Sequence, residues 1–302
     1  MLGAELIVGV VALYLGALFL IAHRGDAQPE GHVSRHQSLI FTLSLTVYCT
    51  SWTFFGAVGN AAQGGLAFFA IYLGPILVFL LLPGLLKKLV AVGKRQKSTT
   101  IADFIAGRYG KSHRVAALVT LIALVGTLPY ISLQIKAIAS AYDALGGGPD
   151  GASLFGNLDT ALVLTLILAA FAVLFGARTI DASVHHRGMI HAIAFESIVK
   201  LAAFLAIAAL AVHLLQRLAA HSGQLDTAGL MLLPFHGSDL NTDFLTRPLL
   251  AAAAILCLPR QFHVLVVEGR GNELPFARWG FPLYLLLFSL AVLPITAAGL
   301  QL

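Results

Sequence analysis

Residues 46–60 read TVYCTSWTFFGAVGN, a run of hydroxyl, aromatic and small side chains inside the apolar stretch 38–60. That stretch is long enough to cross a bilayer, where polar groups need partners inside the protein. One interpretation is that the Thr and Ser hydroxyls bond back to their own helix while the glycines allow close packing. The other is a discontinuous helix whose freed carbonyls bind an ion or a solute near the middle of the bilayer.

A second apolar stretch shows the same conflict, because residues 257–264 read CLPRQFHV. Proline removes a helix hydrogen bond, and Arg260, Gln261 and His263 stand where charged and polar groups are costly. A break in the helix, a polar cluster between helices and a span that ends early all remain open. Two interrupted spans, five helices apart, are typical of transporters built from inverted repeats.

The composition predicts an all-α integral membrane protein. Of the 302 residues, 58% are hydrophobic and 11% are charged, whereas a soluble domain carries about 25% charged residues. We expect about eight transmembrane helices, because each apolar run is close to spanning length. The runs are 2–22, 38–60, 66–86, 115–141, 160–177, 190–215, 247–268 and 279–300.

The charges predict the orientation of the chain. Most of the 19 Lys and Arg residues fall in alternate loops, with eight of them between residues 87 and 114, and the other loops are rich in Asp. The positive-inside rule then places the basic loops in the cytoplasm and the N-terminus in the periplasm of a bacterial inner membrane. The basic charge is therefore assigned to topology and lipid contact, and nucleic acid is not expected as a partner. The chain stops at Leu302 directly after a hydrophobic run, so we expect a fragment.

Several short strings resemble the sodium/solute symporter family, most closely its branch fused to sensor histidine kinases, the CbrA-like regulators. Their order and spacing carry the resemblance over essentially the whole chain. The strings are YCTSWTFFG at 48–56, IYLGP at 71–75, TIADF at 100–104, RYG at 108–110, LPYISLQIKA at 128–137 and PRQFHV at 259–264.

The resemblance implies a LeuT-type helical bundle with inverted five-helix repeats behind an extra first helix. Residues 1–22 would be that helix, 38–215 the first repeat, and 247–302 the first two helices of the second repeat, so the bundle is incomplete. All of 1–302 would be one transmembrane domain.

The resemblance also implies a site. The backbone carbonyls of Thr46 and Cys49 would ligate sodium, which is the one cofactor or metal expected, and carbonyl oxygens suit a hard cation. Tyr48 stands where some relatives have a carboxylate, and the remaining sodium ligands of the family would lie beyond Leu302. The candidates for lining a substrate cavity are Trp52, Tyr130, Gln134, Gln261 and His263.

Two opposite charges stand four residues apart in the sixth predicted span, at Glu196 and Lys200. An isolated charge at that depth costs about 2.5–3.5 kcal/mol, so we expect the two to neutralise one another. The pair is either structural or, together with Arg260, takes part in gating or coupling.

These observations predict transport or sensing of a small polar solute, for example an amino acid such as histidine. In the complete polypeptide the chain would be the sensory input module of a two-component histidine kinase, which would act on a response regulator. The alternatives are a sodium-coupled symporter without a kinase and a non-transporting membrane anchor or interaction module. No catalytic residue is predicted, because residues 1–302 contain no recognisable kinase part, paired carboxylates or nucleophile motif.

Overall fold

The structure is a computed structural model that describes residues 4–27, 36–146, 159–171, 187–222 and 242–301. These residues form helices and turns, with no strand among them, which confirms the predicted all-α membrane class. The parts of the predicted loops at 28–35, 147–158, 172–186 and 223–241 lie outside the described residues, as do 1–3 and 302.

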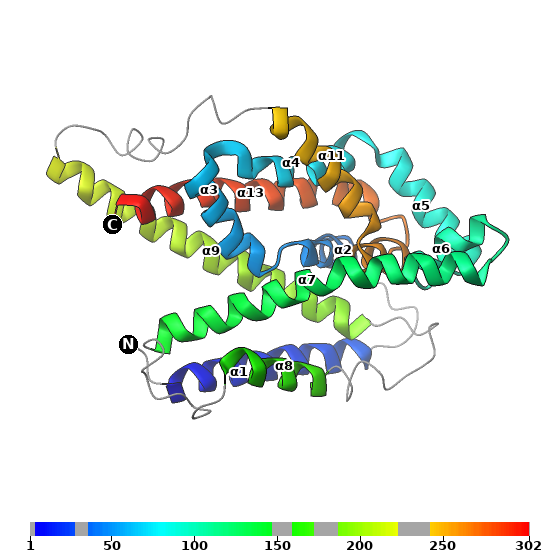
Figure 1. Ribbon diagram of the computed structural model, residues 1–302, viewed down its shortest axis with the longest axis horizontal. Coiled ribbons are helices and arrows are strands. Elements are labelled where there is room, and N and C mark those ends of the chain that lie inside the picture. Colours follow the sequence, from blue (N-terminus) through cyan, green and yellow to red (C-terminus); the bar gives the residue numbers. More distant parts are fainter. Residues whose placement is uncertain (1–3, 28–35, 147–158, 172–186, 223–241, 302) are drawn as a thin grey trace.

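Five segments of the described chain are long and apolar enough to cross a membrane, and a bent helix pair makes a sixth. Two shorter apolar helices, Gln37–Tyr48 and Thr160–Ala170, account for the remaining predicted runs. The long helices are α1 (Ala4–Asp26), α7 (His113–Gly146), α9 (Arg187–Ser222) and α13 (Leu274–Gln301), and they run lengthwise through the molecule in Figure 1.

The second and third predicted spans differ from the observed helices. The run 38–60 is split into α2 (Gln37–Leu45), η1 (Thr46–Tyr48), η2 (Trp52–Gly56) and α3 (Ala57–Gly64). After a turn at Gly65, whose φ is 55°, the chain continues through η3 (Gly65–Phe69) and α4 (Ala70–Leu81). The predicted span 66–86 ends early because Pro83 begins a new helix, α5 (Pro83–Gln96), and proline fits the first turn of a helix.

Helices α1 and α9 approach each other closely where two glycines meet. A Cβ atom on Gly25 would lie 2.8 Å from the Cα of Gly188, and one on Gly188 would lie 2.1 Å from the carbonyl oxygen of Ala22. Asp26 Oδ1 accepts a hydrogen bond from the amide of Gly188 at 2.7 Å. The last residue of α1 thus satisfies one of the free amides at the start of α9.

Helices α4 and α11 (Thr242–Cys257) also approach each other closely at a glycine. A Cβ atom on Gly74 would lie 2.3 Å from the carbonyl oxygen of Pro248 and 2.6 Å from the amide nitrogen of Ala252. Because small residues let membrane helices approach closely, Gly74 sets the distance between these two helices.

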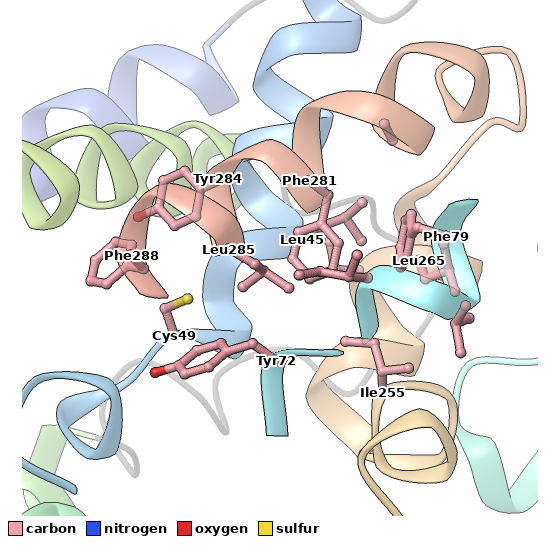
Figure 2. Close-up of a cluster of buried hydrophobic side chains, with 14 of the residues drawn as sticks. Leu45, Cys49, Tyr72, Phe79, Ile255, Leu265, Phe281, Tyr284, Leu285 and Phe288 are labelled. Atoms are coloured by element: carbon pink, nitrogen blue, oxygen red, sulfur yellow. The ribbon is translucent and has the colours of Figure 1, made fainter. Parts of the chain in front are cut away.

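The main core lies where α2, α4 and α13 meet (Figure 2). Its largest members are aromatic, and Phe281 and Phe288 on α13 are fully buried. Phe288 stacks on Phe204 of α9 with ring centroids 4.9 Å apart, and Phe79 of α4 lies 4.6 Å from Phe281. This aromatic packing fixes α13 against the helices that carry the candidate site.

A short helix, α6 (Ile101–Arg108), precedes α7. The Thr100 hydroxyl accepts from the amide of Asp103 at 3.1 Å, and Gly110 follows the helix with φ of 65°. A threonine cap and a glycine with positive φ thus mark the two ends of this helix.

Candidate functional site

The first predicted helix break is present between η1 and η2. Cys49 has extended backbone angles, φ −80° and ψ 113°, and the helix resumes at Ser51. The amide of Thr50 donates to the hydroxyl of Thr53 at 3.1 Å, so a side chain within the motif replaces the missing backbone acceptor. The alternative of a continuous helix with hydroxyls bonded back along it is therefore wrong for this segment.

The second break lies between α11 and α12 (Pro259–Phe262), where the chain bends by 56°. Leu258 is extended, with ψ of 127°, because the ring of the following proline disfavours a helical residue before it. The helix then continues as a π-helical segment, η6 (His263–Glu268). Both sequence signals for a discontinuous span thus correspond to a real interruption.

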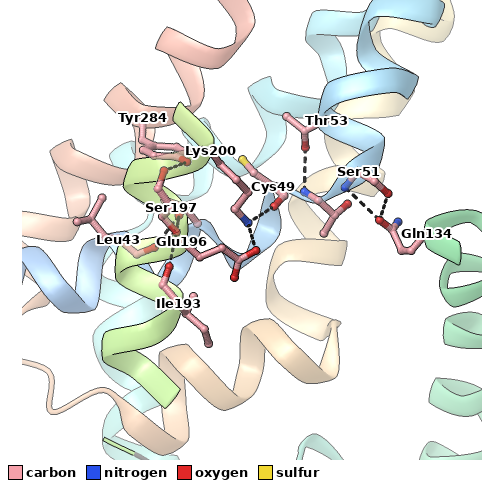
Figure 3. Close-up of polar contacts among 12 residues, drawn as sticks. Leu43, Cys49, Ser51, Thr53, Gln134, Ile193, Glu196, Ser197, Lys200 and Tyr284 are labelled. Atoms are coloured by element: carbon pink, nitrogen blue, oxygen red, sulfur yellow. Dashed lines mark hydrogen bonds and ion pairs between the residues drawn. The ribbon is translucent and has the colours of Figure 1, made fainter. Parts of the chain in front are cut away.

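Helix α7 is attached to the first break through two polar pairs. The hydroxyls of Thr50 and Tyr130 are hydrogen-bonded to each other. The side-chain oxygen of Gln134 accepts from both the hydroxyl and the amide of Ser51, the amide at 3.1 Å, as Figure 3 shows. The start of η2 is therefore fixed by side chains of α7.

Helix α9 approaches the same break with an ion pair. The Lys200 ammonium lies 2.9 Å from the carbonyl oxygen of Cys49 and 3.1 Å from a carboxylate oxygen of Glu196 (Figure 3). This confirms that the two charges pair. The ammonium additionally occupies a backbone acceptor that the interruption of the helix has freed.

One turn away from Lys200, a buried network fixes the register of α9. The Ser197 hydroxyl lies 2.5 Å from the Thr46 hydroxyl and 3.0 Å from the carbonyl oxygen of Leu43. Tyr284 of α13 donates its hydroxyl to the carbonyl oxygen of Ser197 at 2.8 Å. Hydrogen bonds therefore join α9 to α13 and to the end of α2 and η1, beside the break.

A cavity of about 360 Å³ opens at this point, within the size range of small-molecule sites. Arg260 from α12 and the pair Glu196 and Lys200 supply charged groups to its wall, and Gln134 supplies an amide. The whole lining is Val47, Cys49, Thr50, Ser51, Phe54, Phe55, Gln134, Ile138, Glu196, Lys200 and Arg260. The cavity thus combines two cations, one anion and an amide at the first break.

Two of these side chains have polar atoms whose partners are incomplete. Arg260 donates from Nη2 to the Tyr130 hydroxyl at 3.0 Å and lies over that ring at 4.7 Å. Its Nε and the Nε2 of Gln134 are buried without a hydrogen-bond partner among the described residues. Such groups are costly to bury, so they are available to a polar ligand.

The structure divides the predicted cavity residues. Gln134 lines the cavity, and Tyr130 supports Arg260 at its edge. Trp52 faces a neighbouring cleft of about 570 Å³ whose wall is mainly apolar. Gln261 is buried and bonds to α2. His263 is the first residue of η6, and its Nε2 lies 3.4 Å from a carboxylate oxygen of Glu268, the last residue of that segment. Neither Gln261 nor His263 is among the residues that line the 360 Å³ cavity.

Sequence reasoning did not single out Thr50, Ser51, Ser197 and Tyr284, although each bonds at the site. Thr50 and Ser51 lie in the hydroxyl-rich motif, which was a usable signal. Ser197 is next to Glu196, but its partners are distant in sequence. Nothing in the sequence around Tyr284 separates it from an ordinary core aromatic residue.

These features define a multi-pass, all-α membrane protein with a charged cavity at a helix break. Part of the chain is similar to a Bacillus subtilis (strain 168) protein described as the uncharacterized symporter YodF, with 32% identity over 127 residues. The match covers 42% of this chain and 24% of that relative's length. No family model matches the sequence. No solved structure matches it either.

Proposed function

We propose that this chain is part of a solute transporter and binds a small zwitterionic solute, such as an amino acid, in the 360 Å³ cavity. The observation that carries the proposal is that Arg260, Gln134 and Glu196, from three different helices, line one cavity at an interrupted helix. The partial likeness to a protein named as a symporter supports transport as the purpose of that binding.

The charges of the wall favour a solute that has both an acidic and a basic group. The guanidinium of Arg260 suits a carboxylate, because charge-assisted hydrogen bonds are stronger than neutral ones. The side chain of Glu196 is about one third exposed. Among the described residues, its carboxylate pairs with one side chain, that of Lys200. A carboxylate oxygen has more than one lone pair, so Glu196 retains acceptor capacity for a solute amine.

The break itself supplies adaptable backbone. Membrane transporters place solutes at interrupted helices because freed backbone groups and nearby side chains together replace water around the solute. Thr50 and Ser51 lie in the break, and both are bonded to α7. Movement of α7 would therefore be transmitted directly to the wall of the cavity.

Direct binding tests the proposal. The purified chain in lipid nanodiscs is titrated with radiolabelled histidine and with a panel of unlabelled amino acids as competitors. We expect saturable binding that Arg260→Gln and Gln134→Leu each weaken at least about ten-fold, the effect of losing about 1.4 kcal/mol. Arg114→Gln, at an exposed arginine near the start of α7, is the matched control and leaves binding unchanged.

Absence of saturable binding for every amino acid in the panel would reject the proposal. Wild-type binding that tolerates both cavity substitutions would reject the assigned cavity. Membership of this chain in the sodium/solute symporter family stays a prediction from the sequence. So do the LeuT-type fold with a periplasmic N-terminus and the signalling to a histidine kinase.

A further inference from the structure

The backbone oxygens that the sequence resemblance assigns to sodium already have donors. The carbonyl oxygen of Thr46 accepts from the amide of Cys49 at 2.8 Å. The carbonyl oxygen of Cys49 accepts from Lys200 Nζ at 2.9 Å. The second donor carries a full positive charge, so the residues present do not fit a sodium ion at Cys49.

We infer that the Lys200 ammonium is the cation of this site, supplied by the chain itself in place of sodium. An ammonium offers an oxygen acceptor the same unit charge as sodium, with hydrogen bonds instead of coordination. A sodium ion on the Cys49 oxygen would lie beside Nζ, and two like charges at so short a separation repel each other.

The charges around Lys200 strengthen this exclusion. Glu196, on the same helix, neutralises one positive charge at 3.1 Å. Arg260, from α12, lines the same cavity and brings a second positive charge. The charged side chains in the described wall therefore leave it net positive before any free cation arrives.

The position of the ammonium is fixed by packing that is independent of its charge. Ser197, three residues before Lys200, bonds to the carbonyl oxygen of Leu43, and Tyr284 bonds to Ser197. The Lys200 side chain is 16% exposed. The packing of α9 thus places Lys200 Nζ at the break, and no bound sodium ion is needed to hold it there.

If the cavity binds solute as proposed above, that binding requires no sodium. This consequence rests on the proposed function, whereas the occupation of the cation position by Lys200 does not. The occupation of the cation position by Lys200 is therefore tested without any solute, separately from solute binding.

The experiment uses the purified chain and measures radiolabelled sodium binding and the apparent melting temperature in sodium or choline chloride at equal ionic strength. We expect no saturable sodium binding and no sodium-specific shift for the wild type. Lys200→Ala lowers the melting temperature, and methylammonium chloride restores part of it because the small cation enters the vacated position. Lys88→Ala, at an exposed lysine of α5, is the control and shows neither effect.

Saturable sodium binding to the wild type would overturn the inference. So would a Lys200→Ala variant that melts like the wild type, or one that choline and methylammonium stabilise equally. If Lys200→Ala does not fold, the sodium measurement on the wild type still decides the question.

Discussion

Gln261 donates a hydrogen bond from Nε2 to the backbone carbonyl oxygen of Leu45 at 3.1 Å, across 216 positions of sequence. Leu45 is the last residue of α2 and lies one short helix, η1, before the first break, and Gln261 follows the second break. Both residues are fully buried. The helix that leads to the first break is therefore joined directly to the helix that follows the second break.

Replacing Gln261 with leucine should remove the hydrogen bond that joins α12 to α2. The carbonyl oxygen of Leu45 then loses its side-chain donor in a buried place, which costs about 1–3 kcal/mol. The expected result is a lower apparent melting temperature of the purified protein in detergent. Gln63→Leu makes the same chemical change at an exposed position of α3 and should leave the melting temperature unchanged. Equal effects of the two substitutions would show that the Gln261 contact contributes nothing to stability.

Tyr284→Phe should loosen α9 from α13 without changing the shape of the core. The substitution removes only the hydroxyl that donates to the Ser197 carbonyl oxygen, and we expect a loss of about 0.5–1.5 kcal/mol. Thermal unfolding measures the effect, with Tyr109→Phe at a 64% exposed tyrosine as the control. An unchanged melting temperature for Tyr284→Phe would mean that aromatic packing alone holds this junction.

The positions of the two breaks could be predicted because each has a local cause. Pro259 cannot continue a helix, and it constrains Leu258 as well. The hydroxyl-rich motif around Thr53 offers the backbone alternative hydrogen bonds, which compete with a helix. Local chemistry of this kind can be read without knowing which other helices are near.

The partners across the site could not be predicted, because they depend on the register of whole helices. Lys200 and Cys49 are 151 positions apart, and a rotation of α9 by one residue would direct the ammonium elsewhere. The same limit applies to Gln261, which was expected in the cavity but is turned toward α2. The predicted end of the span 66–86 is wrong for a simpler reason. Apolar residues continue past Leu81, where α4 ends, but Pro83 starts another helix.

Gly74→Ala tests the contact between α4 and α11. The added methyl group would lie 2.3 Å from the carbonyl oxygen of Pro248, so one helix must move away. Overpacking of this kind costs about 1–3 kcal/mol and should lower the melting temperature. Gly59→Ala is the matched control, because a Cβ atom there has no atom within 4 Å. If both variants melt alike, α4 and α11 are free to separate and the contact is not tight in the protein.

The N-cap of α6 predicts a local dependence on pH outside the apolar spans. Burial raises the pKa of Asp103, but hydrogen bonds with Thr99 and Thr100 outweigh it and bring the pKa below its usual value. The carboxylate is therefore favoured in the folded helix. Its contribution to stability is present above the pKa of the unfolded chain, about 3.9, and is lost as the pH falls through the lower folded pKa.

Amide hydrogen exchange of residues 101–108 measures this contribution separately from global unfolding. Thr100→Ala removes the cap and should reduce protection in α6 by about 1 kcal/mol at neutral pH. Thr99→Ala removes one hydrogen bond to the carboxylate, so in that variant the folded-state pKa of Asp103 should rise toward its unfolded value. The acid-induced loss of protection should then be smaller, and complete at a higher pH, than in the wild type. Thr120→Ala provides the control, because its hydroxyl bonds within α7 to the carbonyl oxygen of Ala116. An unshifted pH profile in Thr99→Ala would mean that Thr99 does not hold the carboxylate, and that the Thr100 cap alone stabilises the start of α6.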